Sequence, residues 1–307
     1  MMARKGKVLF HQYFKEWFEL YKLGAVRDVT LRKYDLTWRH LQRLAPDLTL
    51  DQLTKKNYQG LLNQFAQSHE KQTTLDFHHL VKGAILEAYD EGLIDRDPTR
   101  KVVIKGIKGK AKKAKYLNQE DLHKLMNQLH LQPEVSYDWL ILLVAKTGLR
   151  FSEALGITPA DFNFSQHMLS INKTWDYKKY EGGFVPTKNP SSVRKIRLDW
   201  QLTLQFKQLI QDFPLKQPIF IQGRIHNSTV NQRLAKLCQQ AEIPEITIHA
   251  LRHTHASLLL YGGVSIASVA KRLGHANMAT TQKTYLHIIQ ELEDKDNNKM
   301  MEILCQL

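Results

Sequence analysis

A basic segment from Arg100 to Lys115 does most to limit how this chain can fold. It holds eight lysines and arginines and no acidic residue, and it follows closely on Asp97-Pro98, which closes the preceding pattern. Blocks of like charge are typical of solvated linkers, and in a protein this basic they also suit contacts to phosphates. The chain is long enough for a domain on either side. We therefore predict a first domain over residues 1–104, a basic linker over residues 105–115 and a second domain over residues 116–307.

The first of these parts is predicted to be a bundle of four helices. Apolar and aromatic residues recur at the three-and-four spacing of one helix face from Phe10 to Tyr21, and again from Phe77 to Ala88. Thr30 and Thr54 are suited to cap the two helices between them. Gly92 can end the last helix in the left-handed conformation. Four short-linked helices of this kind form a small bundle with the aromatic residues in its core.

The second part changes its pattern twice, which predicts helices around a small sheet. Asn118 is suited to cap a helix, and the apolar run that begins at Trp139 ends at Gly148. From His167 to Leu198 short stretches of strand-forming residues alternate with turn residues. The remainder returns to helices, with glycines as breaks. We expect a mainly α fold with a small antiparallel β-sheet, which belongs to the α+β class.

The charge of the chain points to a polyanionic partner. The formal net charge is +14 and the isoelectric point is near 9.6. Nucleic acid is the commonest partner of so basic a protein, although charge alone does not separate DNA from RNA or anionic lipid. Cys238 and Cys305 make no disulfide framework or zinc spacing. The longest apolar stretch, from Trp139 to Ala145, is too short to span a bilayer, so we expect a soluble cytoplasmic protein without membrane contact.

Breaking a phosphodiester without a metal requires three kinds of side chain. A nucleophile must attack phosphorus, and tyrosine can do so if cationic neighbours favour its phenolate. Arginine can neutralise the negative charge on the nonbridging oxygens, because its planar guanidinium can donate hydrogen bonds to two of them at once. Lysine or histidine can give the leaving oxygen a proton. The second domain supplies this set in five segments: Arg150 in TGLRFSE, Lys188 in PTKNPSSVR, His249 and Arg252 in HALRHTH, His275 in RLGHANM and Tyr285 in TTQKTYLH.

These segments resemble the signature of the tyrosine recombinase (phage integrase) family, in the order Arg, Lys, His-x-x-Arg, His, Tyr. The spacing of ten between His275 and Tyr285 matches as well. The resemblance is close from Tyr116 to His287 and looser over the helical bundle, which is similar to the family's core-DNA-binding domain. The lysine segment looks more like integrases of phages and conjugative elements than chromosome-dimer resolvases. The resemblance implies a site-specific DNA recombinase, of bacterial or phage origin, that integrates or excises a mobile element without a cofactor.

The resemblance also implies how the bond is broken. Tyr285 is expected to attack the scissile phosphate, which leaves a 3′-phosphotyrosine link and a free 5′-hydroxyl. Arg150 and Arg252 are expected to clamp the nonbridging oxygens in the transition state. Glu153, three residues after Arg150, resembles an acidic position that supports the site from behind.

Three further matched residues are expected to handle protons and hydrogen bonds. Lys188 would protonate the leaving 5′-oxygen, His249 would accept the proton of the tyrosine, and His275 would donate a hydrogen bond to phosphate. Other lysines near the predicted hairpin compete for the first role: Lys178, Lys179 and Lys195.

A histidine cluster raises the alternative of a metal site. His249 and His253 have the spacing of one helical face, and His255 follows. Arg252 between them would repel a cation, and this stretch contains no acidic or thiol ligand. We therefore expect no metal, and we expect His253 and His255 to pack or to contact phosphate.

Two other functions share some of these features. A type IB topoisomerase uses the same phosphotyrosine chemistry, but the His-x-x-Arg segment and the chain length favour the recombinase. A DNA-binding regulator with an idle site would not need all six chemical groups. Covalent trapping on a nicked substrate would separate the enzyme from the regulator.

The resemblance extends to partners. Double-stranded DNA is the expected substrate, and a homo-tetramer is expected on two DNA sites, with the tail from Glu291 to Leu307 docking on a neighbouring protomer. A directionality factor or a host DNA-bending protein is a possible further partner. The helical stripe starts near residue 10, so we expect an N-terminal arm-binding domain to be absent or to have been trimmed. The lysines expected to grip phosphates are Lys105, Lys108, Lys110, Lys112, Lys113 and Lys115.

Overall fold

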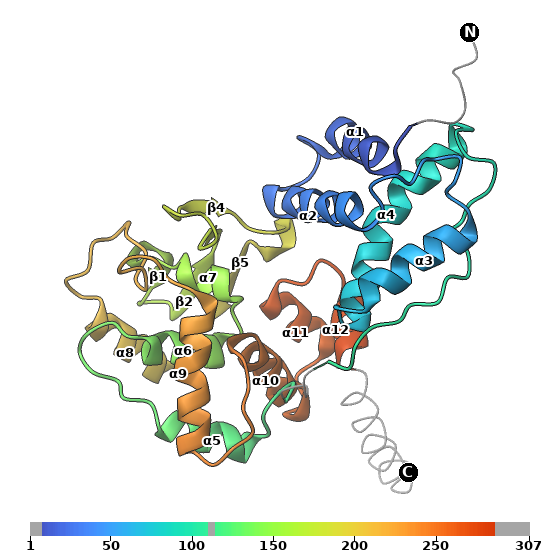
Figure 1. Ribbon diagram of the computed structural model, residues 1–307. Coiled ribbons are helices and arrows are strands. Elements are labelled where there is room, and N and C mark those ends of the chain that lie inside the picture. Colours follow the sequence, from blue (N-terminus) through green and yellow to red (C-terminus); the bar gives the residue numbers. More distant parts are fainter. Residues whose placement is uncertain (1–7, 110–113, 286–307) are drawn as a thin grey trace, which may run out of the picture. The chain divides into compact units, whose positions relative to one another are not determined.

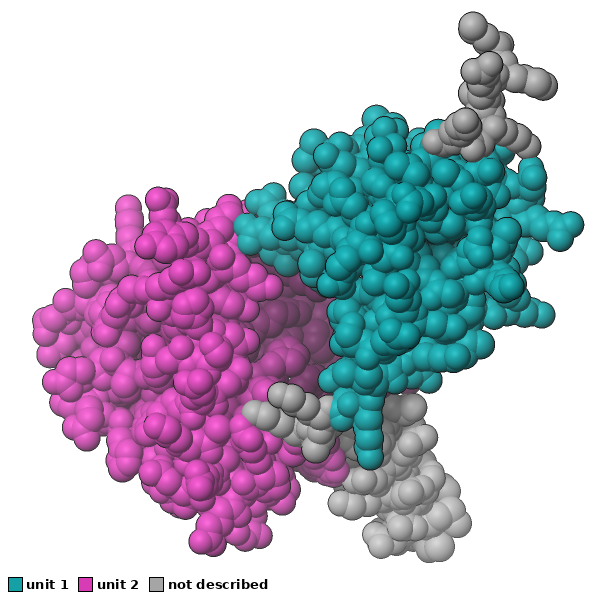
Figure 2. Space-filling model, viewed as in Figure 1, with its two compact units in different colours: residues 1–112 teal, residues 113–307 magenta. Residues whose placement is uncertain are grey.

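The structure is a computed structural model that describes residues 8–109 and 114–285. The chain divides into two compact units, residues 1–112 and residues 113–307 (Figure 2). The division falls inside the segment that we predicted to be a basic linker. Each unit has its own hydrophobic core.

Residues 8–109 of unit 1 form four helices, as the apolar stripes predicted (Figure 1). Thr54 caps the third helix through a 3.3 Å hydrogen bond that its Oγ1 accepts from the amide of Asn57. Gly92 has a φ of +69°, which is the left-handed conformation expected after the last helix. The prediction for Thr30 was wrong: the second helix begins at Asp28, and Thr30 lies within its first turn. The helices are α1 (Phe10–Lys22), α2 (Asp28–Leu44), α3 (Lys55–Ala66) and α4 (Lys71–Asp90).

The start of the basic segment packs along unit 1. The side chain of Gln59 on α3 receives a hydrogen bond from the amide of Val103 and donates one to its carbonyl, both at 2.9 Å. The amide of Ile107 donates to the carbonyl of His69 at 2.9 Å. Apolar residues of this segment therefore join the bundle, and the predicted linker is partly ordered. Lys110, Lys112 and Lys113 lie outside the described residues.

Unit 2 combines helices with two small antiparallel sheets, which confirms the predicted fold class (Figure 1). One sheet has the order β1-β2-β5, and β3 pairs with β4 in a hairpin. The strands are β1 (Phe162–Asn163), β2 (Met168–Ile171), β3 (Lys173–Trp175), β4 (Phe184–Pro186) and β5 (Arg194–Arg197). The helices are α5 (Gln119–Asn127), α6 (Tyr137–Thr147), α7 (Phe151–Leu155), α8 (Trp200–Leu209), α9 (Asn227–Gln240), α10 (Ile248–Tyr261), α11 (Ile266–Leu273) and α12 (Met278–Thr284), with 3₁₀ turns η1 (Pro159–Asp161) and η2 (Pro190–Ser192).

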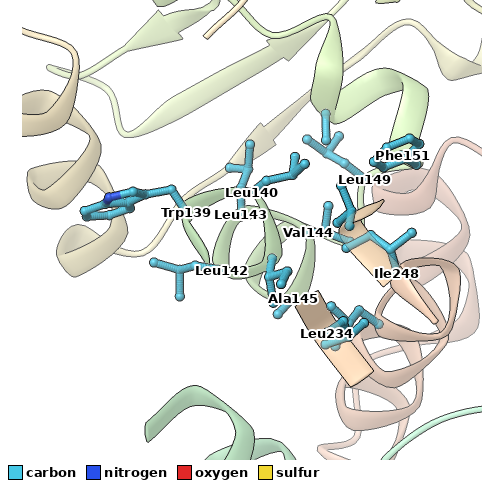
Figure 3. Packing of buried hydrophobic residues seen from close by; sticks show 14 of the residues in the cluster. Trp139, Leu140, Leu142, Leu143, Val144, Ala145, Leu149, Phe151, Leu234 and Ile248 are labelled. Atoms are coloured by element: carbon cyan, nitrogen blue, oxygen red, sulfur yellow. The ribbon is translucent and has the colours of Figure 1, made fainter. Parts of the chain in front are cut away.

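The centre of unit 2 is α6, which is apolar on all sides and therefore buried. It packs against α7, α9 and α10. Figure 3 shows its side chains meeting those of neighbouring elements: Trp139, Leu140, Leu142, Leu143, Val144 and Ala145 of α6, Leu149, Phe151, Leu234 and Ile248. The core holds α6 and α10 together, and both carry or precede residues of the predicted site.

Gly148 ends α6 and turns the chain toward Arg150. Its φ of +69° is a conformation that glycine adopts without cost. A Cβ at this position would also lie 2.7 Å from the ring of His255. The glycine thus meets two requirements at once, a left-handed turn and a close approach to α10.

Candidate active site

The carboxyl end of α11 gathers three arginines. The consecutive carbonyl oxygens of residues 272–274 each accept a hydrogen bond from a different guanidinium. Arg194 Nε donates at 2.6 Å, Arg252 Nη2 at 2.7 Å and Arg150 Nη2 at 3.2 Å. The last carbonyls of a helix lack intrahelical partners and carry partial negative charge, so they suit cations. Residues from three distant segments therefore meet at one helix end.

Glu153 supplies the compensating negative charge. Its carboxylate accepts from Arg150 Nη1 at 2.6 Å and from Arg194 Nη2 at 3.0 Å, and its side chain is 1% exposed. It also accepts from the backbone amide of Arg150, the residue that precedes and caps α7. Burial alone would raise the pKa of Glu153, but the charges of Arg194 and Arg150 hold it below its ordinary value. The group is therefore ionised at neutral pH.

Arg252 is the most enclosed of the predicted cations. It lies on α10 with 3% exposure, and its Nη1 donates to the carbonyl of Gly148 at 2.6 Å. Burial and the charge of Arg150 lower the pKa of Arg252 to about 9, which leaves it charged at neutral pH. Two backbone carbonyls fix the plane of the guanidinium, so it is preorganised before any ligand arrives.

Tyr285 directly follows α12 and is also buried, with 2% exposure. Its ring packs in a small apolar cluster of α10 and α11 residues, and its hydroxyl lies 2.9 Å from Nδ1 of His253. Burial raises the pKa of Tyr285 to about 12, and Arg252 offsets this only in part. In this state the phenol is neutral.

Two of the three histidines of the HALRHTH segment, His249 and His253, lie on one face of α10. Their ring centroids are 4.9 Å apart in an edge-to-face arrangement. His249 as a residue is exposed to solvent, but its ring is partly desolvated by its neighbours, and this desolvation, followed by the charges of Arg252 and Arg150, lowers its pKa. His253 is the histidine that lies within hydrogen-bonding distance of the tyrosine hydroxyl in the structure, and the expected role of His249 as proton acceptor stays a prediction.

His275 follows Gly274, whose φ of +68° ends α11 in a left-handed turn. Its Nδ1 lies 2.6 Å from Oγ1 of the buried Thr281 on α12, which fixes the ring. Burial, followed by the charges of Arg252 and Arg150, lowers the pKa of His275 to about 4. The imidazole is therefore neutral and carries one N–H that can donate.

Lys188 is the predicted proton donor to the leaving oxygen. It is exposed in the loop between β4 and η2. The same loop leads to Ser192, whose hydroxyl accepts from Arg150 Nη1 at 3.3 Å. Its rivals lie on other segments, since Lys178 and Lys179 are in the β3–β4 turn and Lys195 is on β5.

An open cavity of about 520 Å³ leads to the tyrosine. Lys115, at the start of the second unit, lines it together with His249, His253, Lys283 and Tyr285. We expected Lys105 and Lys108, like Lys115, to bind phosphates. Both are exposed, and they lie on the part of the basic segment that packs along unit 1.

Sequence reasoning missed two arginines of this site. Arg194 on β5 bridges Glu153 to α11, and it stood unremarked in the PTKNPSSVR segment. Arg272 donates from Nε to Nε2 of His255 at 2.9 Å, and the other ring nitrogen of His255 lies 3.0 Å from the carbonyl of Ala145. These contacts hold α6, α10 and α11 in place. In the sequence, the only indication of them was that each arginine lies next to a recognised motif.

Within residues 8–109 and 114–285, no group of three or more His, Cys, Asp or Glu side chains is arranged to hold a metal ion. None of the helices in those ranges has the length and apolar character needed to cross a membrane.

The chain resembles known integrases in sequence and in fold. Residues 115–291 match the Phage integrase family. The integrase of Staphylococcus phage L54a is 25% identical over 330 residues, covering 96% of this chain and 93% of that protein. The ICEBs1 integrase of Bacillus subtilis is 23% identical over 71% of this chain and 62% of its own. A solved structure of the Tn1549 transposon integrase in complex with transposon right end DNA has a TM-score of 0.76 at 17% identity, covering 94% and 99% of the two chains.

The fold and these matches define the class of protein, an enzyme that carries out site-specific recombination for a mobile element. The chain belongs to the phage integrase family of tyrosine recombinases.

Proposed function

We propose that the protein binds double-stranded DNA and exchanges strands through a covalent bond between Tyr285 and a DNA 3′ phosphate. The observation that carries this proposal is the meeting of Arg150, Arg252 and His275 at the end of α11, with Tyr285 directly after the adjoining α12. A phosphate seated against these groups would face two fixed guanidinium forks. The DNA in the solved structure of the Tn1549 transposon integrase supports the choice of ligand.

The arginines stabilise the transition state in this mechanism. Attack on phosphorus places additional negative charge on the nonbridging oxygens, and charged donors held in advance stabilise it without reorganising. Arg150 has 24% of its side chain exposed, so it can reach a ligand while Glu153 holds it from behind. His275 adds a neutral N–H donor. Glu153 acts by positioning the arginines.

Proton transfer completes the step. The phenolic proton of Tyr285 must leave as the bond to phosphorus forms, and the 5′-oxygen must gain a proton as its bond breaks. Lys188 is proposed as the donor, because its exposed loop runs toward Arg150 through Ser192. Resealing reverses both transfers with a hydroxyl from another strand. The bond energy is conserved in the phosphotyrosine, so no nucleotide is consumed.

The two units are proposed to share the binding of DNA. Unit 1 and the basic segment would form the core-DNA-binding domain, with Lys105, Lys108 and Lys115 on phosphates. A homo-tetramer would assemble on two DNA sites, in the cytoplasm. The tail from Glu291 to Leu307, proposed to dock on a neighbouring protomer, lies outside the described residues.

A suicide substrate tests the proposal. DNA fragments that tile the ends of the element carry a nick next to the cleavage position, so that the cut strand diffuses away and the covalent complex accumulates. We expect a denaturant-resistant complex with the wild-type protein, and mapping by mass spectrometry should find the DNA on Tyr285. Tyr285→Phe, which keeps the ring but lacks the nucleophile, should bind the same DNA and form no complex. Tight binding by the wild type without trapping would instead indicate a DNA-binding regulator.

A further inference from the structure

Within the described part of the chain, the hydroxyl of Tyr285 lies 2.9 Å from Nδ1 of His253. His253 lies on α10, four residues after His249, and its side chain is half-buried beside the cavity that opens onto the tyrosine. The ring of Tyr285 is held by the apolar cluster, and α10 holds the imidazole. The pair is therefore a fixed feature of two packed elements.

The pKa values of both groups leave this pair neutral. Burial and the charges of His249, Arg252 and Lys115 lower the pKa of His253 to about 4, and burial keeps Tyr285 protonated. In the tautomer that carries the ring hydrogen of His253 on Nε2, the phenol donates and Nδ1 accepts. A neutral imidazole that already accepts from the nucleophile is arranged as a general base.

We propose that His253 is the catalytic residue that takes the phenolic proton of Tyr285, a role that the family pattern had led us to expect of His249. This inference rests on the proposed function. As the Tyr285 oxygen forms its bond to phosphorus, its proton moves to Nδ1 of His253. The bond from phosphorus to the 5′-oxygen breaks, its electron pair stays on that oxygen, and Lys188 protonates it. In resealing, His253 returns the proton to the phenol.

The transfer has to coincide with attack on phosphorus. With the pKa of Tyr285 near 12 and that of His253 near 4, moving the proton beforehand is strongly uphill. Once the oxygen bonds to phosphorus, its proton becomes strongly acidic and a weak base is sufficient. A seated phosphate also offsets the cations that face His253, namely His249 and Arg252 on α10, Lys115 before α5 and Lys283 on α12. The tyrosine is thus unreactive until DNA is bound.

His249 keeps a different part in this arrangement. It stands edge-on to His253 and is exposed at the mouth of the same cavity. That position suits contact with the DNA backbone. Substituting His249 is therefore expected to weaken binding more than the chemical step.

His253→Asn provides the test, with His249→Asn as its matched control. Asparagine places a hydrogen-bonding atom near the position of Nδ1, so it keeps a partner for the phenol but cannot take up a proton. Single-turnover cleavage of saturating suicide DNA is measured from acid to neutral pH. We expect His253→Asn to slow cleavage by about 100-fold or more while DNA affinity stays near that of wild type. The fall in rate on the acid side, caused by protonation of the base, should disappear in this variant and persist in His249→Asn.

Two results would overturn the inference. One is a His253→Asn rate within a few-fold of wild type, which would leave the hydrogen bond a positioning role at most. The other is an acid limb that persists in His253→Asn or disappears in His249→Asn. The Tyr285→Phe variant, assayed in parallel, separates the two proposals. If Tyr285→Phe cleaves DNA, the proposed function is wrong. If Tyr285→Phe is inactive and His253→Asn is fully active, only the inference about His253 is wrong.

Discussion

Glu153 shows how one residue links the site to the stability of unit 2. Its carboxylate neutralises part of the charge of Arg150 and Arg194 in a place where neither carboxylate nor guanidinium is well hydrated. Glu153→Gln would leave Arg194, which is 5% exposed, without its counter-charge. Breaking a buried pair by removing one partner costs about 3 kcal/mol or more. We expect that loss in the free energy of unfolding at neutral pH, measured by urea denaturation.

The same change has a predicted pH dependence. The pKa of Glu153 lies below its ordinary value of 4.5, so the unfolded chain takes up a proton at higher pH than the folded chain does. The stabilisation is therefore fully present above that ordinary value and is lost as pH falls through the folded pKa. The difference in the free energy of unfolding between wild type and Glu153→Gln should become smaller at acid pH. Glu120→Gln, which affects an exposed pair with Lys124, is the control and should change little; a constant gap across the range would contradict the prediction.

Residue chemistry also marks the limit of what the sequence could predict. The arginines, the histidines and the tyrosine could be named because their types and order match one reaction. Whether His249 or His253 meets the phenol could not be decided, because residues four apart share a helix face. The choice depends on where α12 sets Tyr285, which is a matter of tertiary packing. Arg194 was missed for a related reason, since a strand arginine becomes a site residue only when α7 and α11 close around it.

At the scale of elements, the end of α11 is the organising feature of the site. The sequence predicted a break at Gly274 but gave no indication that three arginines would meet there. The left-handed turn at this glycine frees the carbonyls of residues 272–274 to face outward. Its position also leaves no room for a side chain, because a Cβ would lie 2.8 Å from Arg194 Nη1 and 3.1 Å from the carbonyl of Ser191. The end of α11 thus positions the three arginines through its backbone carbonyls.

Gly274→Ala should therefore damage chemistry more than binding. The substitution strains the turn and displaces the arginines, and a displacement of about 1 Å can cost on the order of 100-fold in rate. The control is Gly263→Ala, since Gly263 has a φ of +81° but no atom within 4 Å of its would-be Cβ. Both variants should lose a similar amount of stability from the backbone. Only Gly274→Ala should lose cleavage of the suicide substrate, and equal cleavage rates in the two would contradict this account of α11.

For the whole molecule, the structure revises what the basic segment does. Its composition predicted a linker, yet Val103 and Ile107 bond to unit 1 and carry the flanking lysines with them. The sequence did not predict these contacts with unit 1, because backbone groups and the side chain of Gln59 make them. Hydrogen bonds of this kind leave no periodic pattern of apolar residues. Lys105 and Lys108 therefore belong to an ordered surface of unit 1, and Lys115 belongs to the cavity of unit 2. In the proposed complex with DNA, each unit would therefore contribute part of this run of positive charge.

The number of phosphates that this surface neutralises can be measured. Each lysine–phosphate contact releases counterions, so the logarithm of affinity falls with that of salt concentration by a slope of about 0.9 per contact. Replacing Lys105 and Lys108 with alanine should reduce the slope by up to about 1.8, as titrations over a salt series would show. The same pair replaced with arginine keeps both charges and should keep the slope. If the alanine pair binds with an unchanged slope, these lysines point away from the DNA, and the phosphate contacts of unit 1 must be sought on its helices.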